Sequence, residues 1–310
     1  MSEAAALEAE HLGKRYGRRN WGLRDCTFSV PTGRIAALVG PNGSGKSTLL
    51  TMAAGITRPT TGSVRVLGLD PAMRSGAPLG RLAYLDQERP LYRSFTVGEM
   101  LRYGERLNRR FDVGLAHHYL ATLRISAEAR VGKLSVGQQA QVALTLCVAK
   151  HPEVLLLDEP VAALDPLARE QLMQILLQSV AEEGTTVVFS SHAVAELATT
   201  CDYLILLTGA RVALAEELDY VLASHRLLTG PGGPAVPPSG AALVSEARTS
   251  RQTDLLVRLG EPLEDPAWQV SEPTLEEIVL GYLRAAEPQL DEAIAAARPV
   301  SVRAAEGSGR

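Results

Sequence analysis

The chain of 310 residues lacks the features that mark membrane-spanning and secreted proteins. No apolar run approaches the ~18 residues that a bilayer-spanning helix requires. The N-terminal segment is acidic and rich in alanine, without a basic stretch followed by an apolar one, so we expect no secretory signal. The three cysteines, Cys26, Cys147 and Cys201, are scattered, which indicates reduced thiols in a cytoplasmic protein rather than a disulfide framework or a metal site.

The chain also lacks an excess of positive charge. Its formal net charge is −4, whereas a broad nucleic-acid surface requires a clearly basic domain, so DNA or RNA binding is not favoured. A short basic turn at residues 14–19 is interpreted as a solvated face. What remains is an ordinary globular composition, 46% hydrophobic and 21% charged, with length for a core domain of ~200 residues and an accessory segment.

One glycine-rich stretch dominates the rest of the sequence. Residues 40–48 follow the pattern G-x-x-x-x-G-K-[ST], between a predicted buried strand at 34–39 and a predicted helix start at 47–54. In this context backbone N–H groups and the positive end of the helix point at an anion, and glycine lets the backbone pass close to it. We predict that Lys46 reaches the β- and γ-phosphates of a nucleoside triphosphate and that the Ser47 hydroxyl ligates Mg²⁺. The predicted phosphate-binding set is Gly40, Pro41, Asn42, Gly43, Ser44, Gly45, Lys46, Ser47 and Thr48.

Polar residues follow three further predicted strands. The strand at 81–85 ends at Gln87, an apolar run from Val154 ends at Asp158 and Glu159, and the run at 185–191 ends at His192. The carboxyl ends of parallel strands form the ligand edge of such a sheet, so we expect these side chains to meet there. We predict that Asp158 holds the Mg²⁺ shell and that Glu159 polarises an attacking water. Gln87 is either a plain strand-end residue or a ligand of the metal or its water.

Residues 93–150 carry apolar side chains at helical spacing and form a predicted helical insertion. At its end Ser135 is a good N-cap, and Gly137 permits close approach of the backbone to an anion. Ahead of the phosphate loop, Tyr16 has two open interpretations: a half-buried aromatic at a strand end, or a ring that stacks on the nucleotide base.

The composition changes near residue 228. Residues 229–240 are rich in proline and glycine and are predicted to be a linker that separates a main domain, 1–228, from a small accessory segment, 241–286. Within the accessory segment, Thr274 and Glu277 have the spacing of a capping box. We expect residues 287–310 to be a disordered tail.

The order of these pieces over residues 5–225 resembles the nucleotide-binding subunit of an ATP-binding-cassette (ABC) transporter. Residues 40–48 match the Walker A motif, and 154–159 match Walker B with its catalytic glutamate. Gln87 matches the Q-loop glutamine and His192 the switch histidine. The resemblance implies an α/β P-loop NTPase fold, with a RecA-like parallel sheet core, an antiparallel β subdomain, an inserted helical subdomain and a small C-terminal extension. It also implies that Lys46, Glu159 and His192 form the catalytic set and that Ser47, Gln87 and Asp158 hold the metal.

Residues 134–138, Leu-Ser-Val-Gly-Gln, resemble the family signature Leu-Ser-Gly-Gly-Gln, with Val136 in place of a glycine. Ser135 and Gly137, the residues that approach the γ-phosphate in the family, are kept, so we expect a working site. Through the resemblance Tyr16 becomes the adenine-stacking aromatic. The nucleotide-contacting set outside the phosphate loop is then Tyr16, Gln87, Ser135, Gly137, Gln138, Asp158 and, in the D-loop, Asp165.

The resemblance implies partners as well as a reaction. Two subunits would sandwich two ATP molecules with Mg²⁺, and hydrolysis would open the dimer. The motion would drive a transmembrane permease on separate chains, which places this subunit at the cytoplasmic face of the cell membrane. A single cassette, a proline-glycine linker and the ending at 274–283 are similar to bacterial ABC-2-type export ATPases, so we expect an exporter.

Two other functions fit part of the pattern. A soluble ABC ATPase of DNA repair or translation would carry long coiled coils, a zinc module or a second cassette, and the sequence shows one cassette, no Cys₄ pattern and an acidic balance. A regulatory cassette that binds nucleotide without turnover is supported by Val136 alone, and the presence of Glu159 and His192 argues against it.

Overall fold

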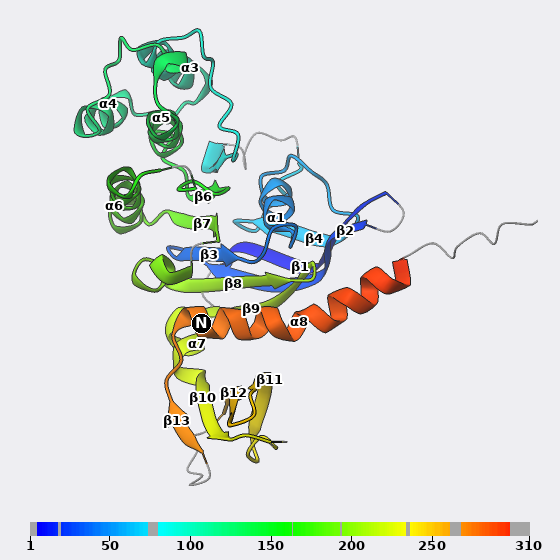
Figure 1. Ribbon diagram of the computed structural model, residues 1–310. Helices are drawn as coiled ribbons and strands as arrows, with labels where there is room; N and C mark the ends of the chain where they lie inside the picture. Colours follow the sequence, from blue (N-terminus) through cyan, green and yellow to red (C-terminus); the bar gives the residue numbers. More distant parts are fainter. Residues whose placement is uncertain are drawn as a thin grey trace, which may run out of the picture.

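The computed structural model describes the backbone of residues 5–17, 20–73, 80–162, 164–192, 194–233, 236–260 and 268–297 (Figure 1). A six-stranded sheet with the order β5-β6-β7-β3-β8-β9 forms the centre. Neighbouring strands are parallel except for the hairpin of β8 and β9. The strands are β3 (Ile35–Val39), β5 (Leu82–Leu85), β6 (Val154–Leu157), β7 (Thr186–Ser191), β8 (Tyr203–Thr208) and β9 (Arg211–Glu217).

The central strands are rich in apolar residues because both faces of the central sheet are covered, by helices and by a second sheet. Every residue of β3, β6 and β7 is buried. The second sheet is antiparallel with the order β2-β1-β4, formed by β1 (Ala5–Tyr16), β2 (Asn20–Pro31) and β4 (Thr61–Val66). Helix α1 (Lys46–Ala53) packs its buried side chains, Leu49, Leu50 and Met52 among them, into the core shared by the two sheets.

The predicted insertion forms a helical layer beyond β6, at one end of the molecule (Figure 1). It contains α3 (Val97–Leu107), α4 (Val113–Thr122), the 3₁₀ helix η1 (Val131–Lys133) and α5 (Val136–Val148). Thr96, Asp112 and Ser135 cap the three α-helices by accepting backbone N–H groups in the first turn. The helix α6 (Pro166–Glu183) follows β6, and the 3₁₀ helix η2 (Val194–Thr199) follows β7. The predicted α/β class, with a parallel core, an antiparallel subdomain and inserted helices, is confirmed.

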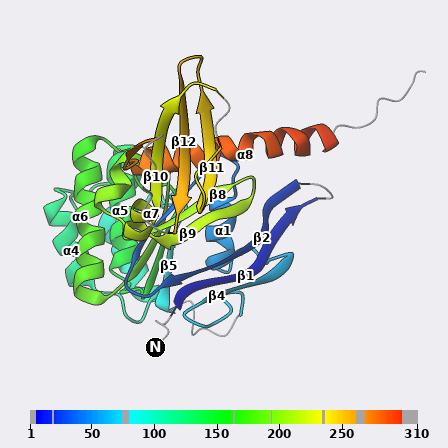
Figure 2. The same cartoon turned by 90° about the horizontal axis from the view of Figure 1, so that it is seen from below.

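The C-terminal part forms a third sheet and a long helix (Figure 2). Its strand order is β11-β12-β10-β13, all antiparallel. The elements are α7 (Leu218–Ser224), β10 (His225–Pro231), β11 (Ala241–Arg248), β12 (Gln252–Leu259), β13 (Gln269–Ser271) and α8 (Leu275–Ala297). Thr274 and Glu277 make the predicted capping-box contacts at the start of α8.

The structure differs from the expected linker and tail. Strand β10 runs through residue 228 into the segment 229–240 and pairs with β12, so the C-terminal sheet begins before the expected boundary. Pairing along β10 satisfies backbone groups that a flexible linker would leave to water. Helix α8 continues to residue 297, past the start of the expected tail at 287, and residues 298–310 lie outside the described part of the chain.

The C-terminal part also shares its core with the central sheet. Leu256 of β12 and Ile278 of α8 are buried in the same apolar cluster as Leu197 of η2 and Leu204 of β8. Figures 1 and 2 both show α8 lying along the β8–β9 side of the body. We therefore describe the C-terminal part as packed on the catalytic fold rather than tethered to it.

Candidate nucleotide site

The phosphate loop is built from glycines in conformations that other residues rarely adopt. Gly43 and Gly45 have φ of 80° and 109°. A Cβ on Gly45 would clash with the carbonyl oxygen of Gly22, and one on Gly40 would clash with the carbonyl oxygen of Leu207. A Cβ on Gly43 would meet nothing within 4 Å, so this part of the loop faces open space. The sequence can form the loop because glycine occupies the positions where the backbone is most crowded or most twisted.

Two buried polar groups of the loop point to an anionic ligand. The Lys46 ammonium lies inside the loop and donates to the carbonyl oxygens of Gly40 at 2.7 Å and Pro41 at 3.3 Å. Burial lowers its pKa, and the nearby carboxylates of Glu159 and Asp158 oppose that shift. The Ser44 hydroxyl is buried without a hydrogen-bond partner among the described residues. A nucleotide phosphate in the loop would supply acceptors for both groups.

The predicted residues from four different strands meet at one cavity of about 620 Å³. It lies at the carboxyl ends of the parallel strands, as the sequence predicted for the ligand edge. The phosphate loop forms one side, and Gln87, Glu159 and His192 reach it from β5, β6 and β7. Its lining is Gly22, Asn42, Gly43, Gly45, Lys46, Ser47, Thr48, Gln87, Glu159 and His192.

The three residues predicted to hold the metal share an adjoining cavity. Ser47, Gln87 and Asp158 line a space of about 480 Å³ together with Asp86 and Glu88. A hydroxyl, an amide oxygen and carboxylates are the donors that Mg²⁺ prefers, with waters completing its shell. The donor set therefore fits Mg²⁺ in chemistry. Among the described residues no cluster of three or more His, Cys, Asp or Glu side chains forms a self-sufficient metal site.

Glu159 and His192 face each other at the edge of the main cavity. His192 Nδ1 lies 3.5 Å from Glu159 Oε2. The Glu159 side chain is 13% exposed while His192 is 62% exposed, so the carboxylate is sheltered and the imidazole remains open to solvent. Glu159 has a φ of 46°, an uncommon conformation for a non-glycine residue that is often found at functional sites.

Sequence reasoning missed two residues that hold the Walker B region. The buried Ser190 hydroxyl donates to Asp158 Oδ1 at 2.6 Å and accepts the Glu159 N–H at 2.7 Å. The Arg89 guanidinium donates to the carbonyl oxygens of Glu159 at 3.4 Å and Pro160 at 3.3 Å. A hydroxyl inside the apolar run of β7 was the available signal for Ser190, because a buried hydroxyl requires a partner. No local pattern marked Arg89.

Tyr16 stands beside the phosphate loop rather than in the core. Its hydroxyl lies 3.4 Å from the Thr48 hydroxyl, and the ring is close to Gly22, which lines the main cavity. The residue is 46% exposed, and the Lys14 ammonium lies 5.6 Å from the ring centroid. The ring is therefore available to a base bound next to Thr48.

The predicted signature and D-loop residues do not line the cavity of about 620 Å³. Ser135 and Gln138 form a capping box at the start of α5, in which each side chain bonds the backbone N–H of the other residue. Asp165 caps α6 by accepting the Ala168 N–H at 2.9 Å. Gly137 lies close to Leu164, so the signature and D-loop segments are neighbours. Within one chain these residues serve local structure, and they stand apart from the phosphate loop.

Comparison with known proteins agrees with this geometry. A family model described as "ABC transporter" matches residues 23–162. A second model, "AAA domain, putative AbiEii toxin, Type IV TA system", matches residues 132–198. The "Phosphonates import ATP-binding protein PhnC 1" of Rhodopseudomonas palustris is 35% identical over 207 residues, 61% of this chain and 74% of that protein. The "Nod factor export ATP-binding protein I" of Rhizobium meliloti is 31% identical over 227 residues, 72% of this chain and 67% of that protein.

The chain belongs to the ABC transporter ATP-binding family. The match spans only 65% of another relative, the "Phosphonates import ATP-binding protein PhnC 1" of Haloquadratum walsbyi, which is 32% identical over 61% of this chain. Among solved structures, cbiO1 from Clostridium perfringens, described as "Part of the ABC transporter complex cbiONQ", has a TM-score of 0.62 at 26% identity and covers 71% of this chain and 92% of its own. The "Dimeric Structure of MJ0796, a Bacterial ABC Transporter Cassette" has a TM-score of 0.61 at 25% identity, over 68% and 98% of the two chains. In the described part of this chain no helix is both long and apolar enough to cross a bilayer.

Proposed function

We propose that this chain hydrolyses ATP as the energy-supplying subunit of an ABC transporter. The observation that carries the proposal is the meeting of Lys46, Gln87, Glu159 and His192 around one cavity. A phosphate loop alone binds nucleotide, whereas a sheltered carboxylate with a histidine beside it adds what hydrolysis of the γ-phosphate requires. This combination favours turnover over the alternative of a regulatory cassette that only binds nucleotide.

Each group of residues at the cavity has a separate role in ATP hydrolysis. Lys46 and the loop N–H groups hold the phosphates and offset the charge that develops as the terminal phosphate leaves. Glu159 orients an attacking water and takes its proton, and the Glu159 backbone is held by Ser190 and Arg89. His192, at 3.5 Å from the carboxylate, positions the water and the γ-phosphate. Ser47, Gln87 and Asp158 would hold Mg²⁺, which would supply positive charge to offset that of the phosphates.

The signature residues act in a second copy of the cassette. Ser135, Gly137 and Gln138 lie at the N-terminus of α5, away from the phosphate loop of their own chain, yet a helix N-terminus of this kind suits a phosphate. In a head-to-tail dimer each nucleotide lies between one loop and the partner's signature, with Asp165 close to the contact. The exposed apolar residues Val136 and Leu167, 58% and 64% exposed, flank these segments and favour burial in such a dimer. The dimeric cassette among the similar structures supports this arrangement.

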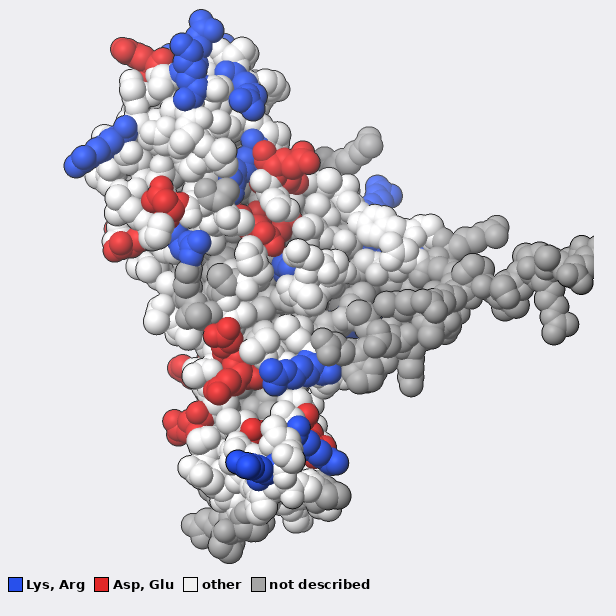
Figure 3. Space-filling view, in the orientation of Figure 1, with Lys and Arg blue, Asp and Glu red and all other residues white. Residues whose placement is uncertain are grey.

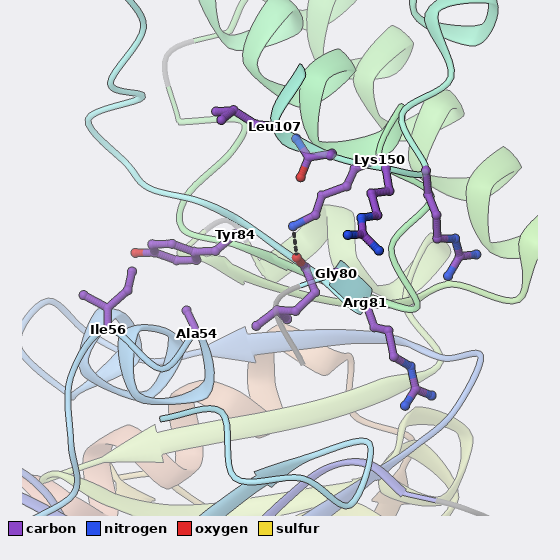
Figure 4. A pocket seen from close by; sticks show the side chains of 11 residues that line it. Ala54, Ile56, Gly80, Arg81, Tyr84, Leu107 and Lys150 are labelled. Atoms are coloured by element: carbon purple, nitrogen blue, oxygen red, sulfur yellow. Dashed lines mark hydrogen bonds between the residues drawn. The ribbon is translucent and has the colours of Figure 1, made fainter. Parts of the chain in front are cut away.

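A membrane permease on separate chains is the proposed partner, and it docks between α3 and the end of α1. A groove of about 400 Å³ there is lined by apolar side chains, and Ile56 and Leu107 on its rim are 65% and 64% exposed. The groove continues into the cavity of about 840 Å³ shown in Figure 4, which shares Ile56, Tyr84 and Leu107 with it. Arg109 and Lys150 add positive charge to the 840 Å³ cavity, whereas the charge of Arg81 is offset by its ion pair with Glu153. A segment with an apolar face and acidic residues at one end fits this surface. With such a partner, we propose that the subunit lies at the cytoplasmic face of the membrane.

Export is the proposed direction of transport. The similar proteins carry both import and export in their names. We propose export because residues 274–283 resemble the corresponding segment of ABC-2-type export ATPases. The alternative of a nucleic-acid-directed ATPase finds little support on the face shown in Figure 3, where Lys and Arg are interspersed with Asp and Glu over the body and gather only at the end formed by the helical insertion.

Capture of the partner from native membranes tests the transporter proposal. The Glu159→Gln protein with Mg-ATP should stay in the nucleotide-bound dimer and co-purify with a polytopic membrane protein. Leu107→Glu in the groove should abolish that capture, whereas the matched control Leu177→Glu, on the exposed face of α6, should preserve it. Recovery of soluble or nucleic-acid-bound proteins alone would contradict the transporter proposal and favour an ABC ATPase of repair or translation.

A further inference from the structure

Positive charge is concentrated in the helical insertion. Residues 93–150 contain nine Lys and Arg against four Asp and Glu, which is a formal charge of +5 in a chain whose net charge is −4. Figure 3 shows basic side chains gathered at this end of the molecule. Charge divided in this way attracts a polyanionic surface to one end of a protein and repels it from the rest. The insertion is therefore the end that an anionic surface would meet.

The cavity of about 840 Å³ collects basic side chains at the base of the insertion (Figure 4). Its cations are Arg81, Arg109, Arg110 and Lys150. Among the described residues that line it there is no Asp or Glu. Glu153, outside the lining, pairs with Arg81 at 2.6 Å and lies 3.6 Å from Arg110, so it offsets one of the charges. The cavity therefore keeps an excess of positive charge.

Arg109 and Lys150 are placed to hold an anion in this cavity. Arg109 is exposed and forms no ion pair with another residue that the structure describes. The Lys150 ammonium is fixed at the wall because it donates to the Leu82 carbonyl oxygen at 2.6 Å, the dashed line in Figure 4. Burial lowers the pKa of Lys150, and a bound anion would oppose that shift. A guanidinium beside an ammonium suits a phosphate group in particular.

A second wall of the cavity is apolar. It is formed by Ala54, Ile56, Tyr84 and Leu107, and Ile56 and Leu107 are exposed. Figure 4 shows Ala54, Ile56 and Tyr84 on one side of the cavity and Arg81 on the other. A free phosphate would contact the cations alone and leave the apolar wall in water. A ligand that satisfies both walls is an amphiphile, with an anionic head and an apolar body.

We propose that this cavity binds the phosphate headgroup of an anionic phospholipid at the membrane surface. The inference rests on the proposed function, which brings the neighbouring groove of about 400 Å³ against a membrane partner. The phosphate contacts Arg109 and Lys150, and the glycerol and first acyl carbons lie on the apolar wall. The basic insertion is drawn to the anionic leaflet, so the same contact turns the groove toward the membrane. An acidic side chain of the protein partner is the competing occupant.

Sedimentation of the full chain with vesicles tests the lipid contact. Wild type should bind vesicles of phosphatidylglycerol and phosphatidylcholine and leave pure phosphatidylcholine vesicles unbound, because only the former are anionic. Arg109→Gln combined with Arg110→Gln should weaken binding roughly twentyfold, the loss of two cations near an anionic surface. The corresponding double change to Lys keeps the charge and should bind as wild type does.

The matched control is Arg24→Gln combined with Arg65→Gln, two exposed arginines on the antiparallel sheet, which gives the same net charge. It should bind vesicles as wild type does, and Tm measurements should show all variants folded. Equal binding of wild type to both kinds of vesicle, or equal binding by the cavity variant and the control, would overturn the lipid contact.

Inorganic phosphate separates a lipid from a free anion as the ligand. Binding should weaken as salt rises from about 0.1 to about 1 M, because the screening length falls from about 10 to about 3 Å. At matched ionic strength, inorganic phosphate should release no more protein from the vesicles than chloride does. Greater release by phosphate would assign the cavity to a free anion and overturn the lipid contact.

Capture in an uncharged detergent separates this inference from the proposed function. In the Glu159→Gln background, the Arg109→Gln and Arg110→Gln variant should still capture the membrane protein, because the groove is intact. Loss of capture, with no binding of anionic vesicles by wild type, would assign these cations to an acidic partner segment and overturn the lipid contact. If the chain binds anionic vesicles and Glu159→Gln captures no membrane protein, only the proposed function is wrong.

Discussion

The Ser190 hydroxyl donates to Asp158 Oδ1 at 2.6 Å, and Ser190 Oγ accepts the Glu159 N–H at 2.7 Å. One buried side chain on β7 thus fixes both acidic residues that end β6. Bonds to charged groups contribute about 1.5–3 kcal/mol, more than neutral ones. Ser190 therefore holds the Asp158 carboxylate and the Glu159 backbone in a fixed position relative to each other.

Ser190→Ala should remove the link between the Asp158 carboxylate and the Glu159 backbone. The buried Asp158 loses a donor, so we expect a kcat lower by about tenfold or more and a free energy of unfolding lower by about 1–3 kcal/mol. Ser126→Ala, a surface hydroxyl in the helical insertion, controls for removal of a hydroxyl in general. ATPase assays with denaturant titration give both numbers, and a Ser190→Ala protein with full activity would show that the bridge has no catalytic role.

Lys46→Met should separate stability from function at the phosphate loop. Burial lowers the pKa of Lys46, so the folded chain keeps this charge at a cost that an apolar side chain of similar length does not have. We expect an equal or higher Tm together with a loss of turnover of about a hundredfold or more, because a phosphate-contacting cation is gone. Calorimetry and phosphate release measure the two quantities; retained turnover would remove Lys46 from the site.

Mixing two inactive variants tests whether the site is shared between chains. Lys46→Ala damages the phosphate loop and Gly137→Arg the signature, so each alone should be inactive. In a mixed dimer one of the two sites would combine an intact loop with an intact signature, and activity should return on mixing. Phosphate release by the mixture, against each variant at the same total concentration, gives the result. Two variants that stay inactive together would argue against a shared site.

Truncating the C-terminal part should destabilise the catalytic fold. Ile278 is fully buried in the cluster that includes Leu204 of the central sheet, so Ile278→Ala should lower the free energy of unfolding by about 2–5 kcal/mol. Leu280→Ala, at an exposed position of the same helix, is the matched control. Deletion of residues 241–310 should lower the Tm of the ATPase by more than Ile278→Ala does. A truncated chain with unchanged Tm would show that the contact between the two parts is weak.

The buried histidine His225 should make this contact sensitive to acid. Its Nδ1 lies 2.7 Å from the Val221 carbonyl oxygen and its Nε2 lies 3.0 Å from the Tyr282 hydroxyl of α8. Burial lowers its pKa below 6.5, so the unfolded chain binds more protons than the folded one below that pH. The stability therefore falls as pH drops through about 6.5 and downward. Thermal melts of His225→Gln should lose part of this acid sensitivity; an identical pH profile would contradict it.

The features of the fold and site that the sequence predicts are those that depend on residues close together in the chain. The phosphate loop and the ends of β5, β6 and β7 were found because each depends on a few consecutive residues and on the rule that parallel strands present ligands at one edge. Arg89 and Ser190 were missed because their partners, Glu159 and Asp158, follow a different strand, β6, and are brought close only by folding. The boundary near residue 228 was misplaced for a similar reason: the proline and glycine content predicts a linker locally, whereas β10 is fixed by pairing with β12.

The measurement that tests the central claim most directly is phosphate release from Mg-ATP by purified full-length wild type and Glu159→Gln, with bound ATP quantified in the same samples. Our account predicts steady turnover in wild type, and in Glu159→Gln a turnover lower by about a hundredfold or more with ATP still bound in a stable dimer. Equal turnover in the two proteins, or no ATP bound to either, would contradict the assignment of this cavity as an ATP-hydrolysing site.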